Sequence, residues 1–99
     1  MHYQPIYGPM ERAQVIFQGK VQGVFFRANC RSKALNIGVT GWVRNLPDGS
    51  VEAVMEGEKN EIEELVIWCK GSQPMARVTG AKVNWYPYIG EYDTFQIKY

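Results

Sequence analysis

The spacing of apolar residues divides the chain into seven predicted elements. Apolar and polar residues alternate through 13–18 and again through 50–57, which is typical of strands with one buried face. Between 26 and 37 the apolar residues recur at helical spacing, and Gly38 follows as a C-terminal cap. The predicted elements are, in order, strand 13–18, helix 26–37, strand 39–46, strand 50–57, helix 60–70, strand 77–86 and strand 94–99.

The second helix carries the clearest local signals. Asn60 is a candidate N-cap, and Glu63 follows three residues later, as in a capping box. The acidic residues at this end favour the positive pole of the helix dipole, so we interpret them as capping residues rather than catalytic ones. The predicted core stripe consists of Ile62, Leu65, Val66 and Cys69.

This order of elements predicts an α+β fold. Two β-α-β units with right-handed crossovers place both helices on one face of a mainly antiparallel sheet, the ferredoxin-like β-α-β-β-α-β sandwich, here with a short C-terminal strand added. Pro47-Asp48-Gly49 is typical of a tight turn and predicts that strands 39–46 and 50–57 form a hairpin. We expect a single domain over 12–99, preceded by a flexible N-terminal arm, 1–11, rich in Pro, Gly and Tyr.

Composition agrees with one globular domain. The chain has 99 residues, 45% of them hydrophobic and 21% charged, and its net charge of +1 gives no overall attraction to nucleic acid or membranes. The charges are unevenly placed, because 12–47 holds six basic residues and no acidic one, whereas 48–64 holds seven acidic residues and one lysine. This pattern indicates either two solvated faces of opposite sign or a basic half that attracts a small anion.

Neither cysteines nor histidine indicate a metal site. Cys30 and Cys69 each fall on the apolar stripe of a predicted helix, which favours buried free thiols over a disulfide bridge. The only histidine, His2, lies in the predicted arm. We therefore expect no metal, no cofactor and no histidine-based mechanism. The sequence shows no apolar run of transmembrane length and no signal peptide, so we expect a cytoplasmic protein.

The stretch 19–27, Gly-Lys-Val-Gln-Gly-Val-Phe-Phe-Arg, connects the first strand to the first helix. A glycine-containing loop before a helix N-terminus turns backbone N–H groups toward one point, where they and the helix dipole can hold a phosphate. Arg27 would form the charged wall of such a cradle. Two alternatives remain open at this stage: the glycines could serve a purely structural turn, and Arg27 could pair with a carboxylate.

RNA binding is the natural competitor for this fold. RNA-recognition domains share the strand order and stack bases on aromatic residues of their central strands. The strand 50–57 has no aromatic residue and carries two carboxylates, which would repel phosphates. The sequence therefore disfavours RNA as a ligand.

Two motifs resemble the signatures of the acylphosphatase family. The stretch 19–27 is similar to the first signature, G-x-V-Q-G-V-x-F-R, at every fixed position. The stretch 41–51, Gly-Trp-Val-Arg-Asn-Leu-Pro-Asp-Gly-Ser-Val, is similar to the second signature, and Gly57 falls where that pattern ends. The resemblance covers 13–99 and implies a small metal-free hydrolase that cleaves the carboxyl-phosphate bond of acyl phosphates.

The resemblance also implies which residues act. Arg27 would bind the phosphate, and Asn45 would position the attacking water. The implied phosphate-binding backbone amides are those of Gln22, Gly23, Val24, Phe25, Phe26 and Arg27. An amide side chain can orient water but cannot deprotonate it, so direct attack without a phosphoenzyme is the implied mechanism. A strand-end turn former is the alternative for Asn45, and spacing alone does not bring it to Arg27.

The implied partners are an acyl phosphate substrate and inorganic phosphate as product or competing ligand. We expect a monomer that binds neither nucleic acid nor membranes. The alternative is a catalytically silent acylphosphatase-like module that binds phosphate or carbamoyl phosphate. A further hypothesis concerns Tyr99, whose α-carboxylate or ring would pack near Arg27 and steady it.

Overall fold

Strands and helices follow one another in the predicted order. The structure, a computed structural model, describes residues 8–99. The elements are β1 (Met10–Lys20), α1 (Phe26–Ile37), β2 (Thr40–Asn45), β3 (Val51–Glu58), α2 (Lys59–Gly71), β4 (Arg77–Pro87) and β5 (Phe95–Lys98).

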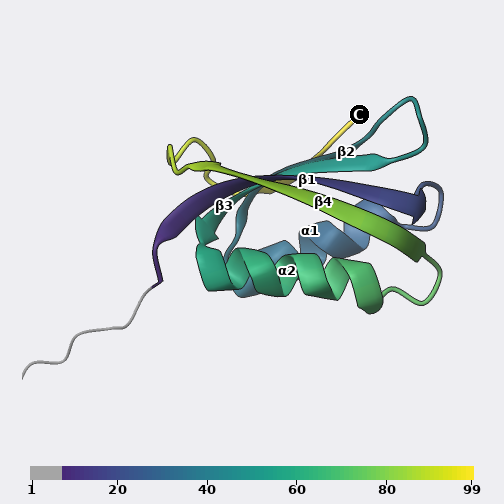
Figure 1. Cartoon of the computed structure of the whole chain (residues 1–99), viewed down its shortest axis with the longest axis horizontal. Helices are drawn as coiled ribbons and strands as arrows, with labels where there is room; N and C mark the ends of the chain where they lie inside the picture. Colours follow the sequence, from purple (N-terminus) through teal and green to yellow (C-terminus); the bar gives the residue numbers. More distant parts are fainter. Residues whose placement is uncertain (1–7) are drawn as a thin grey trace, which may run out of the picture.

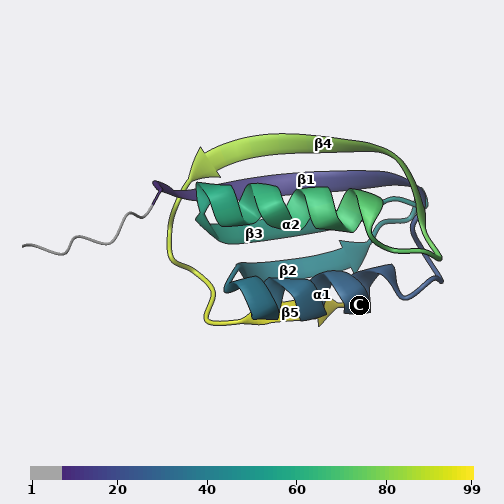
Figure 2. The ribbon, with the colours of Figure 1, turned by 90° about the horizontal axis from the view of Figure 1, so that it is seen from below.

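The strands form one five-stranded sheet in the order β4-β1-β3-β2-β5. All neighbouring strands are antiparallel except β5, which runs parallel to β2. Both helices lie on the same face of the sheet, as Figure 1 shows. From below, α2 lies across β1 and β3, and α1 lies across β2 and β5 (Figure 2). The predicted α+β, ferredoxin-like fold is confirmed.

The hydrophobic core lies between the sheet and the helices. The rings of Phe17 and Phe26 meet edge to face with centroids 5.1 Å apart, joining β1 to the first turn of α1. The apolar stripes predicted for both helices are buried, apart from the half-buried Ile37 at the end of α1. The buried stripe residues are Phe26, Cys30 and Ala34 on α1 and Ile62, Leu65, Val66 and Cys69 on α2.

The first strand is longer than predicted. It begins at Met10, so the last two residues of the expected arm belong to the sheet, where Met10 pairs with Glu58 and Glu11 with Gly57. Strands pair through hydrogen bonds between backbone groups. Pairing can therefore continue beyond the residues in which apolar and polar side chains alternate. Gly8 and Pro9, also in the predicted arm, bond to the fold, since the Gly8 N–H donates to the carboxylate of Glu58 and the Pro9 carbonyl accepts from Lys59. Residues 1–7, with His2, lie outside the described residues.

The start of the second helix differs from the prediction. Glu58, not Asn60, is the N-cap residue, and it contributes no side-chain capping bond. The N–H of Lys59 donates instead to the carbonyl of Pro9 at 2.9 Å, so a segment about fifty residues away satisfies one of the free N–H groups of the helix terminus. The predicted capping box with Glu63 is therefore wrong.

The predicted C-terminal cap of α1 is confirmed, since Gly38 has a φ of 100° and its backbone N–H donates to the carbonyl of Ala34.

The central strand β3 is buried on both faces, although its pattern predicted only one. Glu52 lies between Arg44 and Gln14, with N···O distances of 2.8 and 2.6 Å. Glu56 is covered by the segment after β4, whose backbone N–H groups donate to it. These paired carboxylates belong to the framework of the fold.

The two cysteines are buried free thiols, as predicted. Within residues 8–99, no group of three His, Cys, Asp or Glu side chains lies close enough together to hold a metal ion. None of the helices in this range is long and apolar enough to cross a membrane.

Candidate anion site at the end of the sheet

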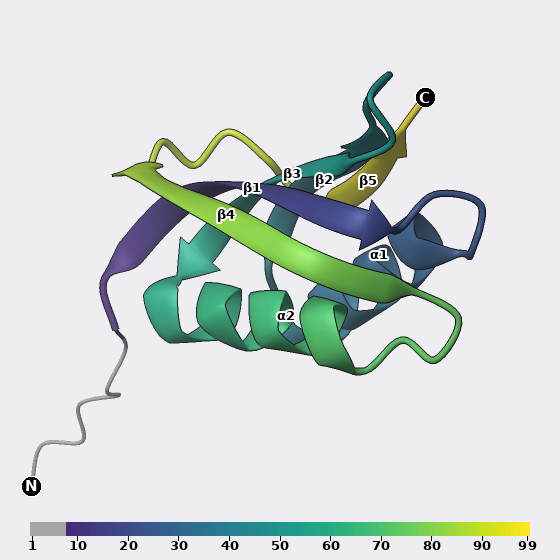
Figure 3. The same cartoon turned by 45° about the vertical axis from the view of Figure 1, so that its right-hand side comes forward.

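Three chain segments converge at one end of the sheet. β1 and β2 both pair antiparallel with β3, and β5 runs parallel to β2, so the carboxyl ends of β1, β2 and β5 point the same way. Phe17, Val51 and Asn45 lie in register across the three central strands. The loop after β1, the turn after β2 and the C-terminal residue therefore gather there (Figure 1 and Figure 3). Both signature motifs lie at this end of the sheet. The spacing of the two motifs in the sequence did not by itself predict that they would meet.

The first part of the site is the loop that enters α1. Gly23 has a φ of 72° and Phe25 a φ of 61°, so the chain reverses sharply before the helix begins at Phe26. The first amides of a helix have no intrahelical acceptor and face outward from its N-terminus. Neither an acidic residue in the first turn nor a side-chain cap neutralises this end of α1. The positive pole of the helix is thus available to an anion.

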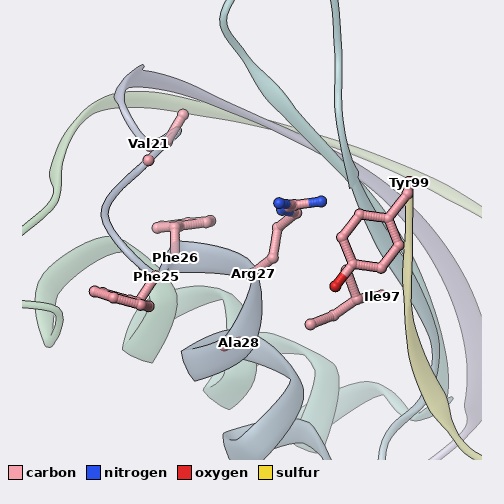
Figure 4. Close-up of a pocket in the computed structure, with 8 residues that line it drawn as sticks. Val21, Phe25, Phe26, Arg27, Ala28, Ile97 and Tyr99 are labelled. Atoms are coloured by element: carbon pink, nitrogen blue, oxygen red, sulfur yellow. The ribbon is translucent and has the colours of Figure 1, made fainter.

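Arg27 lies beside this helix terminus in a cavity of about 320 Å³. Its guanidinium donates from Nη1 to the carbonyl of Lys98 at 3.4 Å, a long contact, and its Cζ atom lies 5.0 Å from the centre of the Tyr99 ring. Figure 4 shows the guanidinium between the loop residues and Tyr99. The cavity is lined by Val21, Gly23, Phe25, Phe26, Arg27, Ala28, Ile97 and Tyr99.

No carboxylate of residues 8–99 forms an ion pair with Arg27. The ion pairs formed within residues 8–99 involve Arg12, Lys33 and Arg44 and leave Arg27 out. The alternative of a helix-start arginine paired with a carboxylate is therefore not found. A guanidinium that faces a cavity with its charge uncompensated can form bidentate hydrogen bonds to an oxyanion.

The side chain of Gln22 joins the loop to the β2–β3 turn. Its Nε2 donates to the carbonyls of Leu46 and Ser50, both at 2.8 Å. Sequence reasoning assigned only the backbone amide of Gln22 to the site and missed this bridge. No local pattern signals the bridge, because its acceptors are carbonyls 24 and 28 residues further along the chain.

The β2–β3 turn is held by its own side chains. Asp48 accepts hydrogen bonds from the hydroxyl and the backbone N–H of Ser50. These bonds, first that of the hydroxyl, lower the pKa of Asp48 below its ordinary value. The turn chemistry predicted for 47–49 thus comes from Asp48 rather than from Asn45.

Asn45 ends β2 with an unsatisfied acceptor. Its side-chain Oδ1 is buried and has no hydrogen-bond partner within the part of the chain that the structure describes. Leaving a buried carbonyl oxygen unpaired is costly, so such an atom calls for an explanation. Asn45 is not one of the residues that line the Arg27 cavity. Its connection to the loop runs through Leu46, whose carbonyl accepts from Gln22.

The structure thus unites part of the predicted set. Gly23, Phe25, Phe26 and Arg27 line one cavity, whereas Gln22 acts as a bridge and Val24 is buried beneath the loop. The prediction omitted the cavity-lining residues Val21, Ala28 and Ile97. Tyr99 was predicted near Arg27, and its ring does lie there.

An α+β domain with an arginine that is free of ion pairs within residues 8–99, beside an acid-free helix N-terminus, has the features of a small anion-binding domain, and comparison with known proteins identifies the family. The sequence model named Acylphosphatase matches residues 13–97. Because this match covers most of the chain, the chain belongs to the acylphosphatase family, whose enzymes hydrolyse acyl phosphates.

Individual relatives agree with this assignment. The chain is 52% identical to an acylphosphatase of Aeropyrum pernix over 89 residues, covering 89% of this chain and 88% of that protein. It is 49% identical to an acylphosphatase of Pelotomaculum thermopropionicum over 88 residues, covering 89% and 96%. The crystal structure of acylphosphatase from Bacillus subtilis superimposes with a TM-score of 0.85 at 32% identity, covering 90% and 99%.

A larger protein contains a similar domain. The crystal structure of T. kodakarensis HypF matches with a TM-score of 0.78 at 29% identity, and the matched part covers 90% of this chain but 12% of that one. A similar domain thus occurs both as a short chain and as a small part of a long one.

Proposed function

We propose that this chain hydrolyses acyl phosphates by direct in-line attack of water on phosphorus, with no phosphoenzyme and no metal. A bond forms between the water oxygen and phosphorus while the bond from phosphorus to the acyl oxygen breaks. The carboxylate leaves with the electron pair, a phosphate oxygen takes one proton of the water, and the other proton stays on the attacking oxygen. A carboxylate leaves readily because its conjugate acid has a pKa of about 4 to 5.

The observation that carries this proposal is the uncompensated Arg27 at an acid-free helix terminus. Phosphoryl transfer spreads charge over the equatorial oxygens, so catalysis depends on positioning and electrostatic stabilisation. Arg27 offers a planar fork of N–H donors, which matches the oxygens of a phosphoryl group. The backbone amides of the loop and first helical turn, residues 22–27, would complete the cage around the same oxygens.

Asn45 is proposed to orient the attacking water. Its Oδ1 is buried and lacks a partner in the described part of the chain, so the side chain would first have to turn this atom toward solvent. Oδ1 could then accept a hydrogen bond from one water proton. Because an amide cannot take the proton away, the role of Asn45 is orientation rather than general-base catalysis.

We further propose that the enzyme is a cytoplasmic monomer, that inorganic phosphate competes for its site, and that it binds neither nucleic acid nor membranes.

Hydrolysis of acetyl phosphate and benzoyl phosphate, with and without a chelator, tests this function. We expect activity that survives the chelator and is inhibited competitively by inorganic phosphate. Activity lost with the chelator would contradict the metal-free mechanism. Phosphate binding without hydrolysis would favour the alternative, a catalytically silent module that binds phosphate or carbamoyl phosphate.

Three variants test the residue roles. Arg27→Ala should lower kcat/KM by about a thousandfold and weaken inhibition by phosphate. The substitution removes the guanidinium that donates hydrogen bonds to the phosphoryl oxygens in the transition state. Asn45→Ala should lower kcat by about a hundredfold with little change in phosphate inhibition. Asn36→Ala, an exposed asparagine on α1, serves as the control and should retain full activity. Wild-type turnover by Asn45→Ala would remove Asn45 from the mechanism.

A further inference from the structure

Phe25 is unusual in both exposure and backbone conformation. Its side chain is 70% exposed, whereas the neighbouring Val24 and Phe26 are 6% and 1% exposed. Within residues 8–99 it is the one residue other than glycine with a positive φ, 61°. A large aromatic residue is disfavoured there, because its Cβ crowds the backbone.

The structure of the fold gains little from this side chain. Phe25 occupies the N-cap position of α1, yet it makes no side-chain capping bond. Its ring is also absent from the buried core cluster. Residues in the left-handed backbone conformation that contribute neither a capping bond nor core packing are concentrated at functional sites. There the strain accompanies a specific placement of the side chain.

The position of the ring suggests what it contacts. Phe25 lines the same cavity as Arg27, and Figure 4 shows it on the side of Arg27 opposite to Tyr99. A phosphoryl group held by Arg27 and the loop amides must leave its acyl group directed outward from the loop. At the mouth of the cavity, where the acyl group would lie, an exposed aromatic ring offers apolar surface to the acyl group. The phosphate oxygens require polar donors instead.

We propose that Phe25 is a specificity-determining residue whose ring contacts the acyl group and favours aromatic or extended apolar acyl phosphates over acetyl phosphate. This inference rests on the proposed function. Tyr99 has a different position, since its ring lies over the guanidinium of Arg27. Loss of the Tyr99 ring should therefore affect every acyl phosphate alike, through the phosphate end of the substrate.

The test compares kcat/KM for benzoyl phosphate with kcat/KM for acetyl phosphate. In Phe25→Ala the ratio of the two should fall about three- to tenfold, the range expected for loss of one aromatic contact. Phe25→Gly should show the same fall, but with a higher Tm than Phe25→Ala, because glycine adopts a positive φ without strain. The two variants then share the loss of selectivity but differ in stability, which separates a substrate contact from a folding defect.

Leu35→Ala is the matched control. Leu35 is an exposed apolar residue of α1, the helix that follows Phe25, but it lies outside the cavity, so its removal should leave the ratio unchanged. An unchanged ratio in both Phe25 variants would overturn the inference while leaving the proposed function intact. Failure of the wild-type protein to hydrolyse either compound would instead overturn the proposed function.

Discussion

At the scale of single residues, the backbone of β2 is most constrained at Gly41. This residue has a φ of 139°, pairs with Met55 of β3 and Phe95 of β5, and donates its N–H to Thr94 at 2.9 Å. A Cβ at this position would overlap the carbonyl oxygen of Val54. Gly41 therefore allows β2 to pair closely on both sides and holds the strand that ends at Asn45.

Gly41→Ala is expected to be strongly destabilising. Backbone cannot move aside as a flexible side chain can, so we expect the free energy of unfolding to fall by about 3 kcal/mol or more. Gly49→Ala separates strain from overlap, because Gly49 also has a positive φ but no neighbouring atom within 4 Å of the added Cβ. Its loss should be about 1 to 2 kcal/mol. Urea unfolding measures both, and equal losses would contradict the overlap argument.

At the scale of elements, the two helices meet at their cysteines. The Sγ atoms of Cys30 on α1 and Cys69 on α2 lie 2.7 Å apart, both thiols are fully buried, and Gln73 donates to Cys30 Sγ at 3.3 Å. The neighbouring Cys30 thiol, together with burial, raises the pKa of Cys69 far above its ordinary range. The reactive thiolate is thereby suppressed at the helix interface.

Both thiols should consequently be protected in the folded, reduced protein. We expect a thiol reagent such as Ellman's to react about a thousandfold or more slower with folded than with unfolded protein, since reaction requires the helices to open. Ser32→Cys, at an exposed position of α1, should add one fast-reacting thiol as an internal standard. Rapid reaction of a native thiol would contradict the burial. Fewer than two thiols in the unfolded wild-type chain would show that the sulfurs are not free.

At the scale of the whole molecule, Glu56 ties the centre of the sheet to the segment that leads into β5. Its buried carboxylate accepts from the N–H groups of Ile89, Gly90 and Glu91 at 2.8, 3.2 and 2.8 Å, and from Arg12 at 3.3 Å. Burial alone would raise the pKa of Glu56. The hydrogen bonds from the three amides and Arg12 outweigh it and hold the pKa below the ordinary glutamate value.

A lowered pKa makes the contribution of Glu56 dependent on pH. The stabilisation is fully present above the ordinary glutamate pKa and is lost as the pH falls through the lower pKa of the folded state. Glu56→Gln should lower the free energy of unfolding by about 3 kcal/mol at pH 7, because its amide cannot satisfy all the donors. The difference from wild type should narrow below about pH 4. Glu63→Gln, at an exposed position, is the control, and a pH-independent difference would contradict the role of the ionised carboxylate.

Much of the fold was predictable from the sequence because it depends on local patterns. The alternation in 13–18 and 50–57, the helical stripe from Phe26 to Ile37 and the turn at 47–49 each arise from neighbouring residues. The two signature motifs are likewise continuous stretches, and they predicted the family. Local signals failed at Asn60, because the carbonyl of Pro9, far away in the chain, satisfies the helix terminus instead.

The sequence by itself thus determined the elements, the fold class, the family and the types of residue available for phosphate chemistry. Tertiary structure alone decided that the carboxyl ends of β1, β2 and β5 meet, that Gln22 joins the two motifs, and that Asn45 is left with an unpaired oxygen. It also decided that Phe25 stays exposed beside Arg27. The physical reason is that strand pairing, burial and hydrogen-bond satisfaction depend on partners tens of residues apart, which no local pattern encodes.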